Sequence, residues 1–432
     1  MTDPFATTRR QFLKTSAIAG TALLAPAILP SRATAAEDGP VLKVGLVGCG
    51  GRGTGAAGEA LAADKNVVLT ALADVFEEKL MASLEILRQQ AAAKVKVAPD
   101  HCFVGLDAYQ KLIDSGVDVV LLATPPGFRP VHLKAAVAAG KHIFCEKPVA
   151  TDAPGVRSVL ETVAEAQKKK LSLVAGFCWR YNLAERALYE RVHAGDIGDV
   201  RAVYATYYTG AVRSMPPASE RPSGMSDLEW QLRYWYNFSW LSGDSLVEQA
   251  VHAVDWILWA FKDQTPQKAV AVGGRQIPTE GGNIFDHFAV NYEFAGGARG
   301  FLGSRQQAGC ANDNTATILG TKGDGCVLGF SGLPSIKGEN PWNFQGPRPN
   351  MYQIEHDELF ASIRSGQPIN NGLRLANSTM AAIMGRMAAY TGQEITWDMA
   401  LNSKESLVPD KLTWKTPIPV PSWAMPGKTK FV

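Results

Sequence analysis

The chain has 432 residues, of which 46% are hydrophobic and 19% are charged. This is the composition of a globular protein with enough apolar material for two hydrophobic cores. The formal net charge is +2 at pH 7, and four of the 43 lysines and arginines lie in residues 1–35. The remainder is close to neutral, so the composition offers no electrostatic basis for binding nucleic acid or an anionic membrane surface.

The first 35 residues have the pattern of a secretory signal. Arg9-Arg10 precedes an apolar run at 17–29, and the small residues 33–35 provide a cleavage site. Paired arginines in this position are typical of the twin-arginine route. The sequence therefore predicts a signal peptide at 1–35 and export of the folded protein to the periplasm.

A membrane anchor is the alternative interpretation of the same segment. Pro26 and Pro30 interrupt the apolar run, which falls short of the roughly 18 consecutive apolar residues that a membrane-spanning helix needs. We therefore expect no stable membrane span after the signal is cleaved.

A glycine-rich turn follows the first apolar strand, which we expect at 41–47. The turn reads Gly48-x-Gly50-x-x-Gly53 and leads into an alanine-rich helical stretch. Strand, glycine turn and helix in this order are typical of a dinucleotide-binding unit, in which the cofactor's pyrophosphate lies at the start of the helix. The expected cofactor-binding residues of the turn are Gly48, Gly50, Gly51, Arg52 and Gly53.

An acidic residue ends the second strand, which we expect at 67–73. Asp74 lies about twenty residues beyond the last glycine of the turn, where an acid binds the ribose hydroxyls of NAD. The sequence therefore favours NAD over NADP. Arg52 is a reservation, because its side chain has the charge to bind either a 2′-phosphate or the pyrophosphate.

Alternating helices and strands continue to residue 177 and predict a doubly wound parallel sheet, a Rossmann domain at 36–178. Ligands of such sheets bind at the carboxyl ends of the strands. Thr124-Pro125 and Glu146-Lys147 follow two strands directly, so we expect both pairs to face the nicotinamide. The expected elements are a helix at 107–115, a strand at 117–124, a helix at 130–139, a strand at 142–145, a helix at 152–170 and a strand at 171–177.

The pattern changes after residue 178 to strands of alternating polarity, which predict an α+β domain built on an open, mainly antiparallel sheet at 179–408. The aromatic-rich segment 212–243 has the side chains either to stack on a sugar or to pack against the core or another subunit. A proline-rich tail at 409–432 is expected to run extended over the surface. The other expected elements are strands at 201–208, 288–294 and 315–319, a long loop over the cleft at 329–350, and helices at 352–365 and 376–390.

A possible catalytic pair lies on a helix expected at about 243–258. Glu248 and His252 are four residues apart on one helical face, so the carboxylate is placed to orient the imidazole, and Asp255 follows one turn later. A histidine held in this way is suited to remove a proton from an alcohol. The alternatives are a histidine of the core, or a metal site with Asp244. Because a second histidine and any clustered cysteines are missing, we assign no metal.

These motifs resemble the Gfo/Idh/MocA family, the glucose-fructose oxidoreductase and inositol dehydrogenase group. The resemblance rests on the glycine turn, on Ala139-Gly140-Lys141-His142 leading to Glu146-Lys147-Pro148, and on Glu248 with His252. It implies that Lys147 is the active-site lysine and His252 the catalytic histidine. Glu248 stands where many sugar dehydrogenases of the family have aspartate.

The resulting hypothesis is an NAD(P)-dependent oxidoreductase that oxidises a secondary hydroxyl of a sugar, glycoside or polyol. We expect a small carbohydrate substrate and a homo-oligomer, either a dimer or a tetramer. One alternative is a redox-neutral glycosidase or epimerase that holds its NAD tightly. Another is a sugar-binding module without catalytic activity.

The export hypothesis predicts the result of replacing both Arg9 and Arg10 by lysine. Lysine keeps the charge but loses the planar guanidinium, and the two residues are not interchangeable where geometry is recognised. Fractionation and immunoblotting should then find the uncleaved precursor in the cytoplasm. Unchanged recovery of mature protein from the periplasm would contradict the assignment.

Overall fold

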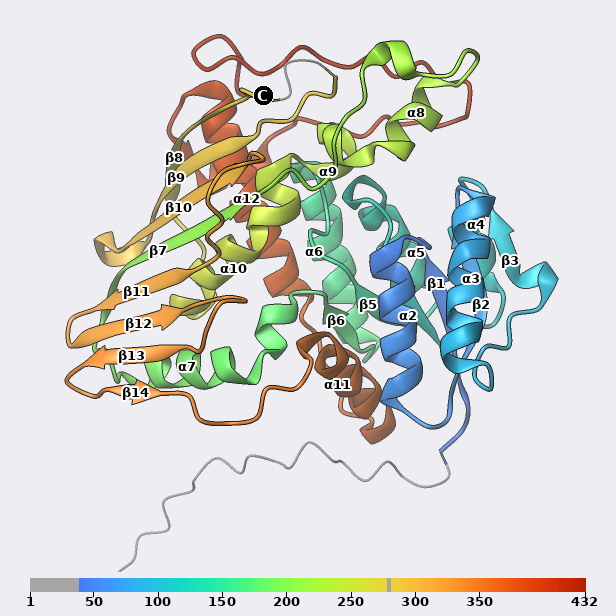
Figure 1. Ribbon diagram of the computed structural model, residues 1–432, viewed down its shortest axis with the longest axis horizontal. Helices are drawn as coiled ribbons and strands as arrows, with labels where there is room; N and C mark the ends of the chain where they lie inside the picture. The colour runs from blue at the N-terminus through green and yellow to red at the C-terminus, as the bar shows by residue number, and fades with distance from the viewer. Residues whose placement is uncertain (1–38, 278–280) are drawn as a thin grey trace, which may run out of the picture. The chain divides into compact units, whose positions relative to one another are not determined.

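The computed structural model describes residues 39–277 and 281–432 (Figure 1). The signal peptide expected at 1–35 lies outside the described residues. Within them, every helix is too short or too polar to cross a membrane.

The first half of the chain forms a six-stranded parallel sheet in the order β3-β2-β1-β4-β5-β6. Helices α2 and α3 pack on one face, and α4, α5 and α6 pack on the other. The expected Rossmann fold is confirmed, because strands buried on both faces need the apolar runs that the sequence shows. The elements are β1 Leu42–Val47, α2 Gly51–Ala63, β2 Val67–Asp74, α3 Glu77–Ala91, β3 Cys102–Val104, α4 Ala108–Asp114, β4 Val119–Leu122, α5 Arg129–Ala138, β5 His142–Cys145, α6 Ala153–Lys168 and β6 Leu173–Ala175.

The second half forms a nine-stranded sheet in the order β14-β13-β12-β11-β7-β10-β9-β8-β15 (Figure 1). Among the described strand pairs of this second sheet only β7 and β10 run parallel, so the expected open, mainly antiparallel sheet is confirmed. The strands are β7 Val200–Thr209, β8 Lys268–Gly274, β9 His287–Glu293, β10 Arg299–Gln306, β11 Ala316–Gly320, β12 Gly323–Val327, β13 Ser335–Gly338, β14 Trp342–Asn343 and β15 Ile395–Thr396.

Helices of the second half cover one face of this sheet and also pack against the Rossmann domain. Helix α10 packs on β7, α12 packs on both β8 and α6, and α11 packs on α2. These helices therefore connect the two sheets into one compact unit. They are α7 Leu183–Ala194, α8 Asp227–Arg233, α9 Ser239–Ser242, α10 Val251–Ala260, α11 Met351–Ser365, α12 Gly372–Thr391 and α13 Trp397–Asn402.

Two expectations of local structure were wrong. The segment 329–350 is not one long loop, because β13 and β14 extend the sheet within it. The helix expected at 243–258 begins as a π-helix at Leu246–Ala250 and becomes α-helical only at Val251. The wider π turn changes which side chains share a face, and this affects the candidate site.

A buried ion pair connects the end of the parallel sheet to α10. Arg180 follows β6 and donates from Nε and Nη2 to the two carboxylate oxygens of Asp255, at 2.7 and 2.9 Å. Both side chains are buried, and Ser378 of α12 donates to the same carboxylate. Asp263, which is half exposed, is a second partner of Arg180 at 2.6 Å.

This geometry predicts unequal effects of removing the two partners. Asp255→Ala leaves a buried guanidinium without its main partner and should lower the free energy of unfolding by about 3–5 kcal/mol. Asp263→Ala removes a solvent-screened partner of the same arginine and should cost about 0–1 kcal/mol. Urea unfolding of the two variants tests this order, and equal losses would contradict it.

Candidate active site

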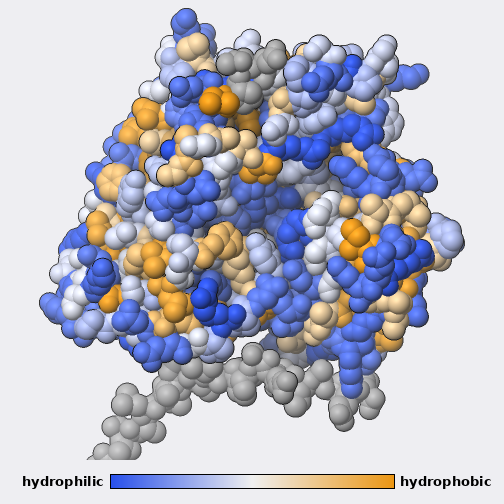
Figure 2. All heavy atoms as spheres, viewed as in Figure 1, coloured by the Kyte–Doolittle hydropathy of each residue, from blue (hydrophilic) through white to orange (hydrophobic). Residues whose placement is uncertain are grey.

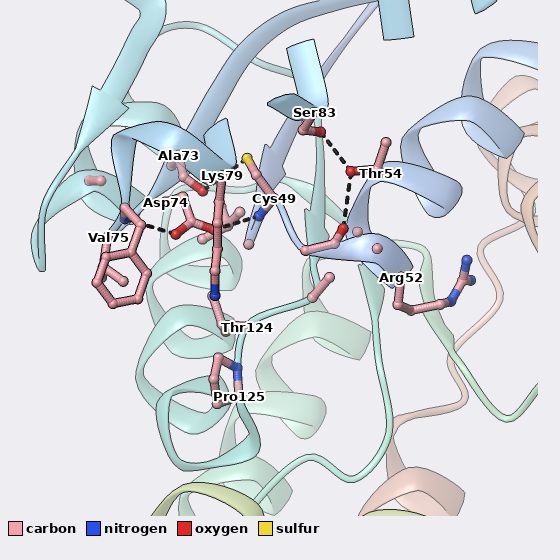
Figure 3. A pocket seen from close by; sticks show the side chains of 18 of the residues that line it. Cys49, Arg52, Thr54, Ala73, Asp74, Val75, Lys79, Ser83, Thr124 and Pro125 are labelled. Carbon is pink, nitrogen blue, oxygen red and sulfur yellow. Dashed lines mark hydrogen bonds between the residues drawn. The ribbon is translucent and has the colours of Figure 1, made fainter. Parts of the chain in front are cut away.

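The larger of two adjoining cavities lies at the carboxyl ends of β1, β2 and β4, as expected for a dinucleotide site (Figure 3). Its volume is about 760 Å³. It is lined by all the residues expected to bind the cofactor except Glu146 and Lys147. These are Gly48, Gly50, Gly51, Arg52, Gly53, Asp74, Thr124 and Pro125.

The glycine turn has the backbone geometry that a bound pyrophosphate needs. Gly48 has a φ of +97°, and a Cβ on Gly53 would lie 1.9 Å from the carbonyl oxygen of Gly48. A Cβ on Gly50 would meet no described atom within 4 Å, so the approach to the turn is open. Within the described chain no side chain caps the start of α2, and its first N–H groups remain available to an anion.

Asp74 is fixed at the end of β2 by backbone hydrogen bonds. Cys49 N–H donates to Oδ2 at 2.7 Å and Phe76 N–H donates to Oδ1 at 2.9 Å. Each carboxylate oxygen can accept a further bond. Asp74 is therefore held where it can also accept bonds from ribose hydroxyls.

The larger cavity is also lined by two basic residues that the sequence analysis did not predict, Lys79 and Arg213. Lys79 lies in the first turn of α3, and burial lowers the pKa of its ammonium group while Asp74 acts in the opposite direction. The sequence did contain a signal for Lys79. It lies five residues beyond Asp74, in a helix that starts just after the strand ends. Arg213 comes from the other half of the chain and had no local signal.

The side chain of Arg52 does not have the orientation expected of a phosphate-binding residue. Its guanidinium points away from Asp74 (Figure 3) and pairs with Glu146, Glu59 and Glu355 at 2.5, 2.8 and 2.7 Å. These carboxylates raise its pKa, although burial acts in the opposite direction. The charge of Arg52 is thus already compensated by the protein, and what it offers a cofactor is the backbone of the turn.

The smaller cavity, of about 340 Å³, adjoins the larger one and shares Arg52, Ala123 and Trp235 with it. It is lined by all four remaining residues of the expected site, which come from β5's end and from the helix of the second half. These are Glu146, Lys147, Glu248 and His252. The space-filling view shows a recess between the two halves of the molecule (Figure 2).

Lys147 and Glu248 form a buried contact across the two halves. The Lys147 Nζ donates to the main-chain oxygen of Glu248 at 2.6 Å and lies 3.3 Å from its carboxylate Oε1. Gln249 donates to the other carboxylate oxygen at 2.7 Å and accepts a bond from the Tyr207 hydroxyl at 3.0 Å. An ammonium group has three donors, so Lys147 keeps one for a ligand in the cavity.

The expected pair of Glu248 with His252 is not formed within the described structure. Glu248 belongs to the π-helical turn and His252 to the α-helix that follows, so a spacing of four residues does not bring the two side chains together. Asp255 is also outside the expected relay, since it binds Arg180. The third candidate, Asp244, accepts bonds from Phe285 N–H and Ser245 N–H and lines neither cavity.

His252 is a buried imidazole that remains neutral. Its Nδ1 is buried with no hydrogen-bond partner in residues 39–277 or 281–432, and its ring lies 6.3 Å from the Tyr207 ring. Burial, and then the charge of Lys147, lower its pKa well below the ordinary value of 6.5. A neutral imidazole beside an ammonium group can accept a proton from a hydroxyl bound between them.

The smaller cavity is also lined by residues that the sequence analysis did not assign to the site. Tyr207 and Gln249 extend the contact of Glu248, while Trp179 and Phe330 form an aromatic wall with ring centroids 4.6 Å apart. Phe330 lies in the segment expected to cover the cleft, which was a usable signal. Arg129, at the start of α5, also lines the cavity.

One group of described side chains has ligand atoms close enough for a metal ion, Glu59, Glu355 and His356. Arg52 bonds to both carboxylates. This guanidinium already supplies positive charge at the position where a metal would supply it, so we assign no metal there.

Comparison with known sequences identifies the family. Residues 42–175 match the model of the "Oxidoreductase family, NAD-binding Rossmann fold", and residues 186–324 match the "GFO/IDH/MocA C-terminal domain". The chain is 28% identical over 237 residues to trans-1,2-dihydrobenzene-1,2-diol dehydrogenase of Sus scrofa, which covers 54% of this chain and 62% of that protein. It is 25% identical to myo-inositol 2-dehydrogenase of Thermotoga maritima, over 65% of this chain and 74% of that protein.

Solved structures show the same fold. Levoglucosan dehydrogenase in complex with NADH and levoglucosan aligns with a TM-score of 0.64 at 19% identity, covering 82% of this chain and 99% of that one. Aldose-aldose oxidoreductase from Caulobacter crescentus aligns with a TM-score of 0.65 at 21% identity and covers 82% and 99%. Because the two matched family models together span more than half of the 432 residues, this chain belongs to the Gfo/Idh/MocA family of oxidoreductases.

Proposed function

We propose that the protein is an NAD-dependent dehydrogenase that oxidises a secondary hydroxyl of a sugar, glycoside or polyol. The observation that carries this proposal is the arrangement of Lys147 and His252 in one small cavity that adjoins the dinucleotide cavity. Membership of an oxidoreductase family supports the reaction type. Relatives named for dihydrodiol and inositol substrates, together with the aromatic wall of the cavity, support the substrate class.

The two proposed catalytic residues have complementary roles. Lys147 directs its remaining ammonium donor at the substrate oxygen and stabilises negative charge there. His252, neutral because its pKa is lowered, accepts the hydroxyl proton. Bound NAD would supply the hydride acceptor. Glu248 is a positioning residue, because it holds the ammonium group of Lys147 through its main chain and its carboxylate.

A redox-neutral glycosidase or epimerase is a second candidate, and one observation favours it. Arg213, Leu232 and Trp235, all from the second half of the chain, form part of the wall of the larger cavity. A cofactor enclosed in this way would be retained between turnovers, as a reaction that returns its hydride requires. The same catalytic residues serve both reactions.

We also propose that the protein acts outside the cytoplasm. The twin arginines and the cleavage pattern of residues 1–35 support this location. Insertion of NAD before export is compatible with a route that carries folded proteins.

The proposed roles predict the effects of substituting the two catalytic residues. His252→Ala and Lys147→Met should each lower kcat by about 10² to 10⁴, the usual loss on removing one positioned acid or base. NAD binding should persist, because the glycine turn is unchanged. Reduction of bound NAD by a panel of sugars, followed by absorbance, measures the rate.

His287→Ala is the matched control, since this histidine lines neither cavity. The low pKa of His252 means that the base stays deprotonated in mildly acidic solution, so kcat/KM should fall only below about pH 6.5. A His252→Ala variant with near wild-type rate would refute the role.

The position of Asp74 predicts cofactor preference. Calorimetry on cofactor-free protein should show tighter binding of NAD than of NADP. Asp74→Asn should narrow the difference, because it removes the charge that repels a 2′-phosphate and weakens bonds to the ribose, worth about tenfold in NAD affinity. Equal affinities in the wild type would mean that Lys79 and Arg213 override Asp74.

A further inference from the structure

Arg129 is a buried cation at the edge of the smaller cavity. Its side chain is 5% exposed, and its Nη1 donates to the main-chain oxygen of Pro148 at 2.5 Å. Its Nε is buried without a hydrogen-bond partner among the described residues, and Nη2 forms no bond with them either. Burial lowers its pKa, as expected for a charge taken out of water.

The other charged groups around this cavity are already paired. Lys147 lies with Glu248, and Arg52 lies with Glu146 and two further carboxylates. His252 is neutral. In the described chain no carboxylate lies within ion-pair distance of Arg129, although Glu146 and Glu248 act on it from farther away.

A buried guanidinium without an anionic partner is costly, and structures compensate such charges by pairing. Of the three cations that line this cavity, Arg129 is therefore the one without a carboxylate at ion-pair distance among the described residues. A ligand that brings a carboxylate into the cavity would compensate the charge of Arg129 and could accept a hydrogen bond from its unpaired Nη2.

We propose that the substrate is an acidic sugar, a uronic acid or a glycoside of one, whose carboxylate binds Arg129 while Lys147 and His252 hold the hydroxyl to be oxidised. This inference rests on the proposed function, because it names the substrate class of the same site. It adds a specificity residue, Arg129, at the start of α5 of the Rossmann domain. The aromatic wall of Trp179 and Phe330 comes from later segments of the chain.

The test compares matched substrates on the NAD-loaded protein. The methyl glycosides of glucose, galactose and mannose are each paired with the corresponding methyl uronide, so that the members of a pair differ only in a CH₂OH or a carboxylate. In at least one pair the wild type should prefer the uronide by about 30-fold or more in kcat/KM, the effect of a buried charge-assisted contact. Arg129→Met should abolish that preference, and Arg129→Lys should retain part of it.

Controls separate the local contact from other effects. Arg201→Met removes an exposed arginine of β7 and should leave the preference unchanged. The circular dichroism spectrum and thermal unfolding of Arg129→Met report whether the variant is folded, and the wild-type comparison stands even if it is not. A wild type that oxidises the neutral glycoside as well as the uronide would overturn the inference and leave the proposed function intact.

The remaining outcomes are also decisive. If Arg129→Met weakens NAD binding and slows both members of a pair equally, the guanidinium serves the nicotinamide and the inference fails. If the wild type reduces its NAD with neither member of any pair, the inference fails, and reduction of NAD by free sugars and polyols then decides the proposed function separately. Survival of the preference in Arg129→Met would assign the carboxylate to another residue.

Discussion

The contact of Lys147 with Glu248 is the constraint on which the rest of the site depends. Lys147 follows the last residue of β5 by two positions, and Glu248 belongs to the π-helix of the other half of the molecule. Both side chains are buried, and a buried charge is tolerated only when it is paired. The two halves must therefore meet in one arrangement, which also brings His252 to the same cavity.

Two arginines, the partly exposed Arg52 and the buried Arg386, reinforce that arrangement from other directions. Arg52 connects the start of α2 to Glu146 before the lysine and to Glu355 in α11. Arg386 in α12 is fully buried and donates to the main-chain oxygens of Thr151 and Gly243. Because these contacts hold backbone that lies within a few residues of Lys147 and Glu248, the site is supported by rigid elements, as precise positioning requires.

The sequence predicted what depends on local pattern. Short runs of residues predicted the parallel strands, the glycine turn and the position of Asp74. The structure contains these elements, and the glycine turn and Asp74 line one cavity. The partners of the charged residues depend instead on long-range contacts. Arg52 binds carboxylates 94 and 303 residues away, which spacing cannot reveal. Glu248 was assigned to His252 because regular helical spacing was assumed across a π-helical turn.

The contacts that hold the second half of the chain against the larger cavity lie apart from Lys147 and His252. Arg233 of α8 pairs with the exposed Glu78 at the start of α3 and lies over the Phe76 ring, and such an exposed pair is worth about 0–1 kcal/mol. Ile418 of the C-terminal tail packs in the same cluster with Phe76, Leu228 and Trp240, and burial of such a side chain is worth about 1.5–3 kcal/mol.

These apolar contacts therefore outweigh the ion pair in holding the second half against the edge of the larger cavity. Each 1.4 kcal/mol changes an equilibrium constant about tenfold. In the proposed function, these contacts of α8 and the tail bear on whether the cofactor exchanges after each turnover, as a net dehydrogenase requires, or stays for many turnovers, as a redox-neutral enzyme requires. The choice between the two reactions is in this sense separate from Lys147 and His252, which both reactions need.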